Sequence, residues 1–293
     1  MNLNDYPLWT AVITPLKEDG TVDYESLGVV LDQQVEAKNG ILILGSTGEA
    51  LNLDLYERQK ILDFLKERKP NVPVMCGVGG SNLEEQKQWI KHLETLPIDA
   101  YLLVVPLYAK PGDEGQYQWF KELMDASTKP CMLYNVPSRT GKPMSFSAVK
   151  KLNTHKNFWA IKEASGSVAE FKKYVEAAGP NGRVYSGDDG LLPAFAPHGC
   201  TGLVSVAANT WPKETHKYTE LTLSGELKEA AMWEDCANSL FVASNPIPAK
   251  WLMHKNKTIA SNKLRAPLTH EDMCEEEKVL EADQKINNWF NNL

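Results

Sequence analysis

A lysine closes one of the apolar segments of the sequence, in the stretch NFWAIKEASG at residues 157–166. Burying an ammonium group is costly unless it is paired or its pKa is lowered. An amine must be neutral to attack a carbonyl carbon, so an apolar setting would suit Lys162 to Schiff-base chemistry. The position alone more often indicates a strand-end lysine whose ammonium group reaches solvent along a buried stem.

The segment GSTGE at residues 45–49 follows another apolar run. Its two glycines permit close approach of the backbone to a ligand, and the hydroxyl and amide groups of Ser46 and Thr47 can hold a carboxylate. Taken alone, such a segment is more often an ordinary strand-to-helix turn in which the hydroxyl groups bond to the backbone.

The segment YNVPSRTG at residues 134–141 ends a further apolar run. The phenol of Tyr134 could pass protons if another hydroxyl lay beside it, and Arg139 is suited to a bidentate grip on a carboxylate. A core aromatic residue and an exposed loop charge explain these two residues equally well. Tyr108, in the loop after a preceding run, is a weaker candidate because loop aromatic residues usually only pack.

Eight runs of the sequence are nearly continuously apolar, as is typical of parallel strands covered on both faces. Segments with helical periodicity lie between them, so the order of elements predicts an α/β fold, a closed (β/α)8 TIM barrel with its active site at the C-terminal ends of the strands. The alternative, an open doubly wound sheet, more often carries a GxGxxG or GxxxxGK[ST] loop, and neither motif occurs. The predicted strands span residues 8–14, 41–44, 73–78, 100–105, 130–134, 158–162, 183–186 and 202–206.

Helix starts and the C-terminal region complete the predicted organisation. Three helix starts have the spacing of a capping box, which satisfies otherwise unpaired amide groups. They are Asp54 with Glu57, Ser81 with Glu84, and Ser167 with Glu170. After Gly225 the pattern predicts helices over residues 226–243 and 271–293, joined through NPIP at residues 245–248. We therefore expect a barrel domain over residues 1–225 and a helical appendix over residues 226–293.

The composition is that of an ordinary soluble enzyme, with 43% hydrophobic residues among 293 and a formal net charge of −7. The negative charge argues against a general nucleic-acid binder, and no apolar run approaches the ~18 residues of a membrane span. Five scattered cysteines without a CxxC pair, and histidines outside any metal-binding motif, favour a reducing compartment. We expect a cytoplasmic enzyme that needs no metal and binds neither nucleic acid nor membrane.

Five motifs together carry a family resemblance. GSTGE, YNVPSRTG, IKEASG, SGDD and NPIPAK occur in an order and spacing similar to those of the dihydrodipicolinate synthase/N-acetylneuraminate lyase superfamily. The resemblance runs from TAVITPL near the N-terminus into the helical appendix. Any one motif is a weak signal, but five in order are specific, and they favour the Schiff-base role for Lys162.

The resemblance implies a set of catalytic roles. Lys162 resembles the lysine that condenses with the C2 carbonyl of pyruvate, so that no separate cofactor is needed. Tyr134 resembles the residue that moves protons at this centre. With Thr47 and Tyr108 it would form a relay of hydroxyl groups, in which Tyr108 reaches the site from a neighbouring subunit.

The resemblance also implies substrate contacts. Ser46 and Thr47 would hold the pyruvate carboxylate, and the backbone oxygens of Gly187 and Val204 would lie near the substrate. Arg139 matches the arginine that binds the carboxylate of aspartate semialdehyde in the synthase branch. Ser46 stands where those enzymes usually carry a threonine, and a serine hydroxyl can make the same hydrogen bond.

The function implied is a class I aldol condensation of pyruvate with aspartate 4-semialdehyde, a lyase-type reaction giving 4-hydroxy-tetrahydrodipicolinate for lysine and diaminopimelate biosynthesis. The resemblance also implies a homotetramer built as a dimer of dimers. One alternative is a lyase for N-acetylneuraminate or a 2-keto-3-deoxy sugar acid. Another is a non-catalytic barrel that senses a keto acid, although a sensor has no need of a proton relay.

Overall fold

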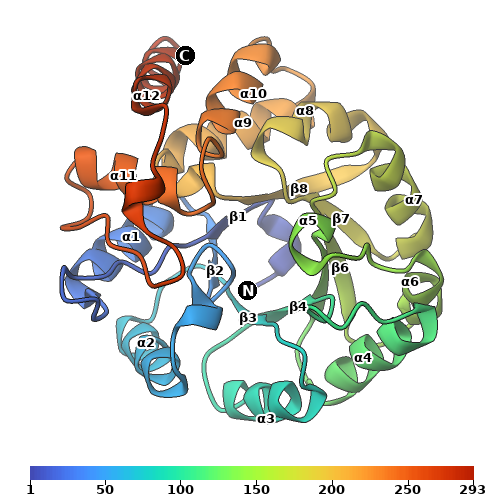
Figure 1. Ribbon diagram of the computed structural model, residues 1–293. Coiled ribbons are helices and arrows are strands. Elements are labelled where there is room, and N and C mark those ends of the chain that lie inside the picture. The colour runs from blue at the N-terminus through green and yellow to red at the C-terminus, as the bar shows by residue number, and fades with distance from the viewer. The chain divides into compact units, whose positions relative to one another are not determined.

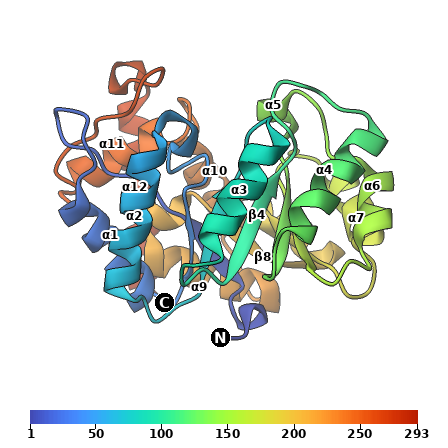
Figure 2. The same ribbon diagram turned by 90° about the horizontal axis from the view of Figure 1, so that it is seen from below.

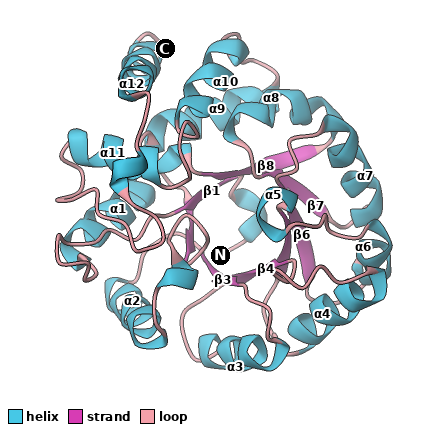
Figure 3. Cartoon of the chain, viewed as in Figure 1, coloured by secondary structure: helices cyan, strands magenta, loops and turns pink.

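The computed structural model describes residues 1–293. Eight strands pair in chain order as a closed barrel, and helices alternate with them along the chain (Figure 3). The predicted TIM-barrel fold is confirmed. The strands are β1 (Leu8–Ala11), β2 (Gly40–Ile43), β3 (Val74–Val78), β4 (Ala100–Val104), β5 (Cys131–Asn135), β6 (Phe158–Glu163), β7 (Arg183–Ser186) and β8 (Cys200–Ser205).

The chain forms two compact units, one contiguous and one made of both ends of the sequence. The first consists of Val74–Val204, and the second of Met1–Pro73 with Ser205–Leu293. None of the helices combines the length and the apolar character that a membrane span requires.

In the unit Val74–Val204, four helices follow one another along the outer side of the strands (Figures 1 and 2). They are α3 (Leu83–Leu93), α4 (Asp113–Asp125), α6 (Phe146–Leu152) and α7 (Val168–Ala178). Along the chain, the short helix α5 (Pro137–Thr140) lies between β5 and α6, and the short helix α8 (Leu192–Phe195) lies between β7 and β8. The inward faces of these helices bury large side chains, among them Trp119 and Phe171. Strands β4 and β5 are almost completely buried, which explains their unbroken apolar sequence.

The unit formed by both ends of the chain contains β1 and β2 with six helices. They are α1 (Tyr24–Glu36), α2 (Leu55–Arg68), α9 (Pro212–Ser224), α10 (Ala230–Ser239), α11 (Ile247–Lys255) and α12 (Glu276–Asn291). Trp233 of α10 is fully buried. Its ring stacks on Tyr218 of α9 at 4.1 Å between centroids and lies almost perpendicular to the ring of Trp289 of α12, at 5.1 Å between centroids. These aromatic contacts join the three helices.

Two of the three predicted helix caps are confirmed. Asp54 and Glu57 form a reciprocal capping box at α2, and Ser167 caps α7. The third prediction is wrong, because α3 is capped by Asn82 and not by Ser81. The side-chain oxygen of Asn82 accepts hydrogen bonds from the amides two and three residues later, and asparagine is as strong an N-cap as serine.

The C-terminal helices are shorter than predicted, and there is one more of them. Helices α10 and α12 occupy only the central parts of the predicted spans 226–243 and 271–293. Helix α11 begins within the NPIP segment, which the sequence had indicated as a connection. Pro248 lies in its first turn, where a missing amide hydrogen costs no intrahelical bond.

Helix α11 also carries a buried cation. The Nζ atom of Lys250 lies 2.5 Å from Oε1 of Glu49, and both side chains are almost completely buried. Nζ also donates to the carbonyl oxygen of Lys263 at 2.9 Å. Buried charges persist only when they are paired and hydrogen-bonded, so the pair couples α11 firmly to the segment that contains Glu49.

We predict that Lys250→Met lowers the free energy of unfolding by about 3–5 kcal/mol, because it leaves the Glu49 carboxylate buried without its cation. The matched control is Lys213→Met, which removes an ion pair with Glu36 whose side chains are exposed. Its expected effect is below about 1 kcal/mol. Urea unfolding of both variants measures the difference, and equal losses would contradict the prediction.

Candidate active site

Lys162 and Tyr134 lie side by side on neighbouring strands. The parallel register of β5 and β6 places Tyr134 opposite Lys162. The Nζ atom of Lys162 lies 4.3 Å from the centre of the Tyr134 ring, and both side chains are buried. Two residues singled out from different motifs are therefore adjacent at the C-terminal ends of their strands, where barrel enzymes place their chemistry.

The Lys162 amine is strongly desolvated. Burial lowers its pKa to about 8, against the opposing attraction of Asp188 and Asp189 and with a small further decrease from Arg139. Lys162 takes part in no ion pair, and only 4% of its surface is exposed. The alternative of a lysine that reaches solvent does not describe this residue. A buried amine with this pKa is partly neutral near pH 7 and can act as a nucleophile.

Two residues that the sequence did not single out hold the strand ends together. The Nδ2 atom of Asn135 donates to Oε2 of Glu163 at 2.5 Å. Oε1 of Glu163 accepts from the amide of Ser165 at 2.9 Å, and Oδ1 of Asn135 accepts from the amide of Met144 at 2.8 Å. Glu163 is fully buried, and burial raises its pKa. Because Asn135 follows Tyr134 and Glu163 follows Lys162, this hydrogen bond holds Tyr134 and Lys162 in register.

Gly187 follows β7 and lies against Lys162. A Cβ atom at this position would stand 2.9 Å from Cε of Lys162 and 2.8 Å from Cβ of Ala164, so a side chain would displace one of them. The Gly187 amide donates to the carbonyl oxygen of Glu163 at 2.7 Å. The next residue, Asp188, has a pKa raised by burial to about 6. The SGDD motif therefore places the Gly187 backbone against Lys162 and the Asp188 carboxyl group near its amine.

The remaining candidates of this unit differ in exposure. Val204 is fully buried in β8. Arg139 lies on the surface of α5, yet its charge acts on the Lys162 amine. Tyr108 is 94% exposed, in the loop after β4, and its backbone has a positive φ of 65°. An exposed aromatic ring on a backbone conformation that L-residues rarely adopt is unusual and indicates a functional constraint.

The GSTGE segment belongs to the other unit and forms a turn after β2. The Glu49 amide donates to the Ser46 carbonyl oxygen at 3.1 Å. Ser46 is exposed, whereas Thr47 is buried. The Thr47 hydroxyl accepts from Nδ2 of Asn245 at 2.9 Å. A turn is present, as the simpler interpretation of the segment required, but the Thr47 hydroxyl bonds to a distant side chain. Sequence reasoning missed Asn245, and its place at the head of the NPIPAK motif was the available signal.

No group of three or more histidine, cysteine, aspartate or glutamate side chains is arranged to hold a metal ion.

Comparison with known proteins places this arrangement in a family. The profile of the Dihydrodipicolinate synthetase family matches residues 6–286. The chain belongs to this family. A Francisella tularensis subsp. novicida protein named 4-hydroxy-tetrahydrodipicolinate synthase is 44% identical, over 98% of this chain and 97% of the relative. A protein of the same name from Wolbachia pipientis subsp. Culex pipiens is 42% identical, over 96% of each chain.

Solved structures of the dihydrodipicolinate synthetase family share the fold. Dihydrodipicolinate synthase from Aquifex aeolicus aligns with a TM-score of 0.86 at 31% identity, covering 98% of this chain and 97% of that one. The chloride-inhibited enzyme from Acinetobacter baumannii, complexed with pyruvate, aligns with a TM-score of 0.88 at 32% identity, covering 96% and 99%. The family membership implied by the five sequence motifs is confirmed.

The pKa of Lys162 generates a prediction for this member of the dihydrodipicolinate synthetase family. Because burial lowers that pKa to about 8, about one amine in ten is neutral at pH 7. The rate at which Lys162 forms an imine with a small keto acid, measured by borohydride reduction and peptide mass, should rise nearly tenfold from pH 6 to pH 7. It should level off above pH 8. A rate that keeps rising to pH 10 would show an ordinary lysine.

Proposed function

We propose that this chain catalyses the class I aldol condensation of pyruvate with aspartate 4-semialdehyde, giving 4-hydroxy-tetrahydrodipicolinate. The observation that carries the proposal is the buried Lys162 amine, with its pKa lowered to about 8, beside the ring of Tyr134. The names of two similar relatives and the pyruvate complex of the Acinetobacter enzyme support it. In this proposal the reaction takes place in the cytoplasm.

The first half of the reaction builds a nucleophile on the lysine. The neutral amine of Lys162 attacks C2 of pyruvate, and loss of water gives a protonated imine. This imine withdraws electrons, so the pyruvate methyl group loses a proton and an enamine forms. Tyr134 transfers protons at this centre, connected to solvent through the hydroxyl groups of Thr47 and Tyr108. The enamine carbon then attacks the aldehyde carbon of the second substrate. The amino group of that substrate displaces the Lys162 nitrogen from the resulting imine, which closes the ring of the product and frees the amine.

Substrate orientation is assigned to five residues. Ser46 and Thr47 hold the pyruvate carboxylate, and the backbone oxygens of Gly187 and Val204 lie beside the bound substrate. The close approach of the Gly187 backbone to Lys162 supports that part of the proposal. Arg139 binds the carboxylate of aspartate semialdehyde. This arginine favours the synthase over a sialic-acid or sugar-acid lyase, whose substrate carries a long polyhydroxyl chain.

The covalent step is tested by trapping. Pyruvate with borohydride should add mass to the peptide that contains Lys162, and Lys162→Ala should remain folded while losing activity by orders of magnitude. Lys250 serves as the control lysine, since it is buried but paired with Glu49. Its peptide should carry no label in the wild-type protein. A label on another lysine, or none, would refute the mechanism.

The specificity role of Arg139 is separable from imine formation. Arg139→Ala should leave trapping with pyruvate alone largely intact while kcat/KM for aspartate semialdehyde falls by about 30- to 1,000-fold, equivalent to about 2–4 kcal/mol. Arg183→Ala is the matched control. Arg183 is the first residue of β7 and so lies at the end of the strand opposite the C-terminal end, where barrel active sites are found. Equal losses of trapping and turnover in Arg139→Ala would show that the arginine acts on the lysine instead.

The exposed Tyr108 ring motivates a proposal about assembly. We infer a homotetramer, a dimer of dimers, in which Tyr108 serves the site of a neighbouring subunit across a symmetric interface. Mixing Tyr108→Phe with Lys162→Ala should then restore activity to about a quarter of the wild-type level, because one site in each mixed dimer recovers both residues. No recovery after subunit exchange, or full activity of a monomer in sedimentation, would contradict the shared relay.

A further inference from the structure

A single C-terminal stretch, residues 245–265, contacts the GSTGE segment at several points within one unit of the structure. Asn245 donates to Thr47, and Lys250 pairs with Glu49. The amide of Arg265 donates to the other carboxylate oxygen of Glu49 at 2.7 Å. These polar contacts are with residues about 200 positions earlier in the chain, so they are features of the tertiary fold and not of a local turn.

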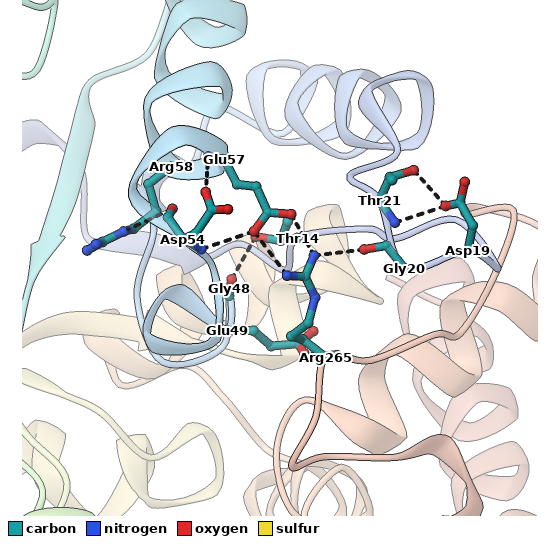
Figure 4. Close-up of polar contacts among 10 residues, drawn as sticks. All are labelled: Thr14, Asp19, Gly20, Thr21, Gly48, Glu49, Asp54, Glu57, Arg58 and Arg265. Carbon is teal, nitrogen blue, oxygen red and sulfur yellow. Dashed lines mark hydrogen bonds and ion pairs between the residues drawn. The ribbon is translucent and has the colours of Figure 1, made fainter.

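The backbone at Glu49 depends on these contacts. Glu49 adopts the left-handed conformation with φ of 54°, which is disfavoured for a residue with a side chain. Its two carboxylate oxygens are held separately by Lys250 and Arg265. The Thr14 hydroxyl donates to the carbonyl oxygen of Gly48 at 2.7 Å, drawn in Figure 4. The end of the GSTGE segment is thereby bonded both to Thr14 near the N-terminus and to the C-terminal stretch.

Arg265 is itself fixed in place. Its guanidinium group makes two hydrogen bonds to the Glu57 carboxylate, at 2.7 and 3.0 Å, and one to the carbonyl oxygen of Gly20 at 2.8 Å (Figure 4). Glu57 belongs to the capping box of α2. The C-terminal stretch therefore reaches the GSTGE segment from an anchored position.

Asn245 determines what the Thr47 hydroxyl can do. A hydroxyl group has one hydrogen to donate and two lone pairs that accept. The Asn245 amide occupies one lone pair of Thr47 at 2.9 Å, and a bond in this direction leaves the hydroxyl hydrogen for another acceptor. Thr47 is 2% exposed and β-branched, so its side chain has little freedom to turn away.

We propose that Asn245 is a positioning residue that makes the Thr47 hydroxyl a hydrogen-bond donor to the carboxylate of the bound keto acid. The remaining contacts of the C-terminal stretch hold the backbone on which Thr47 stands. Asparagine is suited to this task because its amide nitrogen can only donate. An acidic residue of the same shape can only accept, and it would draw the hydroxyl hydrogen to itself. This inference rests on the proposed function, in which Thr47 contacts the pyruvate carboxylate.

The test measures the pyruvate concentration that gives half-maximal borohydride labelling of Lys162, without any aldehyde. Thr47→Val and Asn245→Ala should each raise this concentration roughly 10-fold, and Asn245→Asp roughly 100-fold, as expected when hydrogen bonds to a charged ligand are lost or reversed. Labelling at saturating pyruvate should remain complete in the Asn245 variants. Asn256→Ala, an exposed asparagine on the same stretch, should have no effect.

A double variant separates positioning from a general structural role. If Asn245 acts through Thr47, Thr47→Val/Asn245→Ala should bind pyruvate no more weakly than Thr47→Val alone. Additive losses, or an unchanged concentration in Asn245→Asp, would overturn the inference. Should Asn245→Ala fail to fold, Asn245→Ser enters the same comparison. Failure of the proposed function is a different result, namely no labelling of Lys162 in the wild-type protein.

Discussion

The cost of burying an ammonium group governs the chemistry of this fold, and the chain meets that cost in two ways. Burial also lowers the pKa of Lys250, but the Glu49 carboxylate at 2.5 Å opposes this decrease and keeps the lysine a structural cation. Lys162 is as well shielded from water but has no ion-pair partner, and its pKa falls to about 8. The same residue type thus serves as a brace at one position and, in the proposed function, as a nucleophile at the other. The difference lies in whether a carboxylate is allowed within contact distance.

Several carboxyl groups lie near Lys162, but none of them forms an ion pair with its amine. Glu163 is adjacent in sequence but is turned to Asn135 and the Ser165 amide. Asp188 raises the pKa of Lys162 by its charge while its own pKa rises to about 6 through burial. Near neutral pH the lysine therefore sits in a moderate negative field, which tempers the effect of desolvation. That balance keeps the pKa of Lys162 near the working pH, so the neutral amine and its protonated form are both populated.

Much of the fold could be read from the sequence because parallel strands covered on both faces leave unbroken apolar runs. The strand ends also marked Lys162 and Tyr134, and the register of β5 and β6 places them opposite each other. The choice between neighbouring N-cap residues was harder to predict. Either Ser81 or Asn82 could cap α3, and only the geometry of the backbone decides between them. Contacts across long separations could not be derived at all. Nothing local to Asn245 indicates that its amide meets Thr47, since 198 residues separate the two.

That separation has a consequence for how the protein is made. The unit holding the GSTGE segment is assembled from both ends of the chain, whereas the residues around Lys162 lie in one contiguous stretch. Closing a loop of this length has an entropic cost that only the finished set of contacts repays. On the ribosome, the pairing of Lys162 with Tyr134 can form while the last ninety or so residues are still being synthesised. The contact between Asn245 and Thr47 must wait for them, so it forms later than the contact between Lys162 and Tyr134.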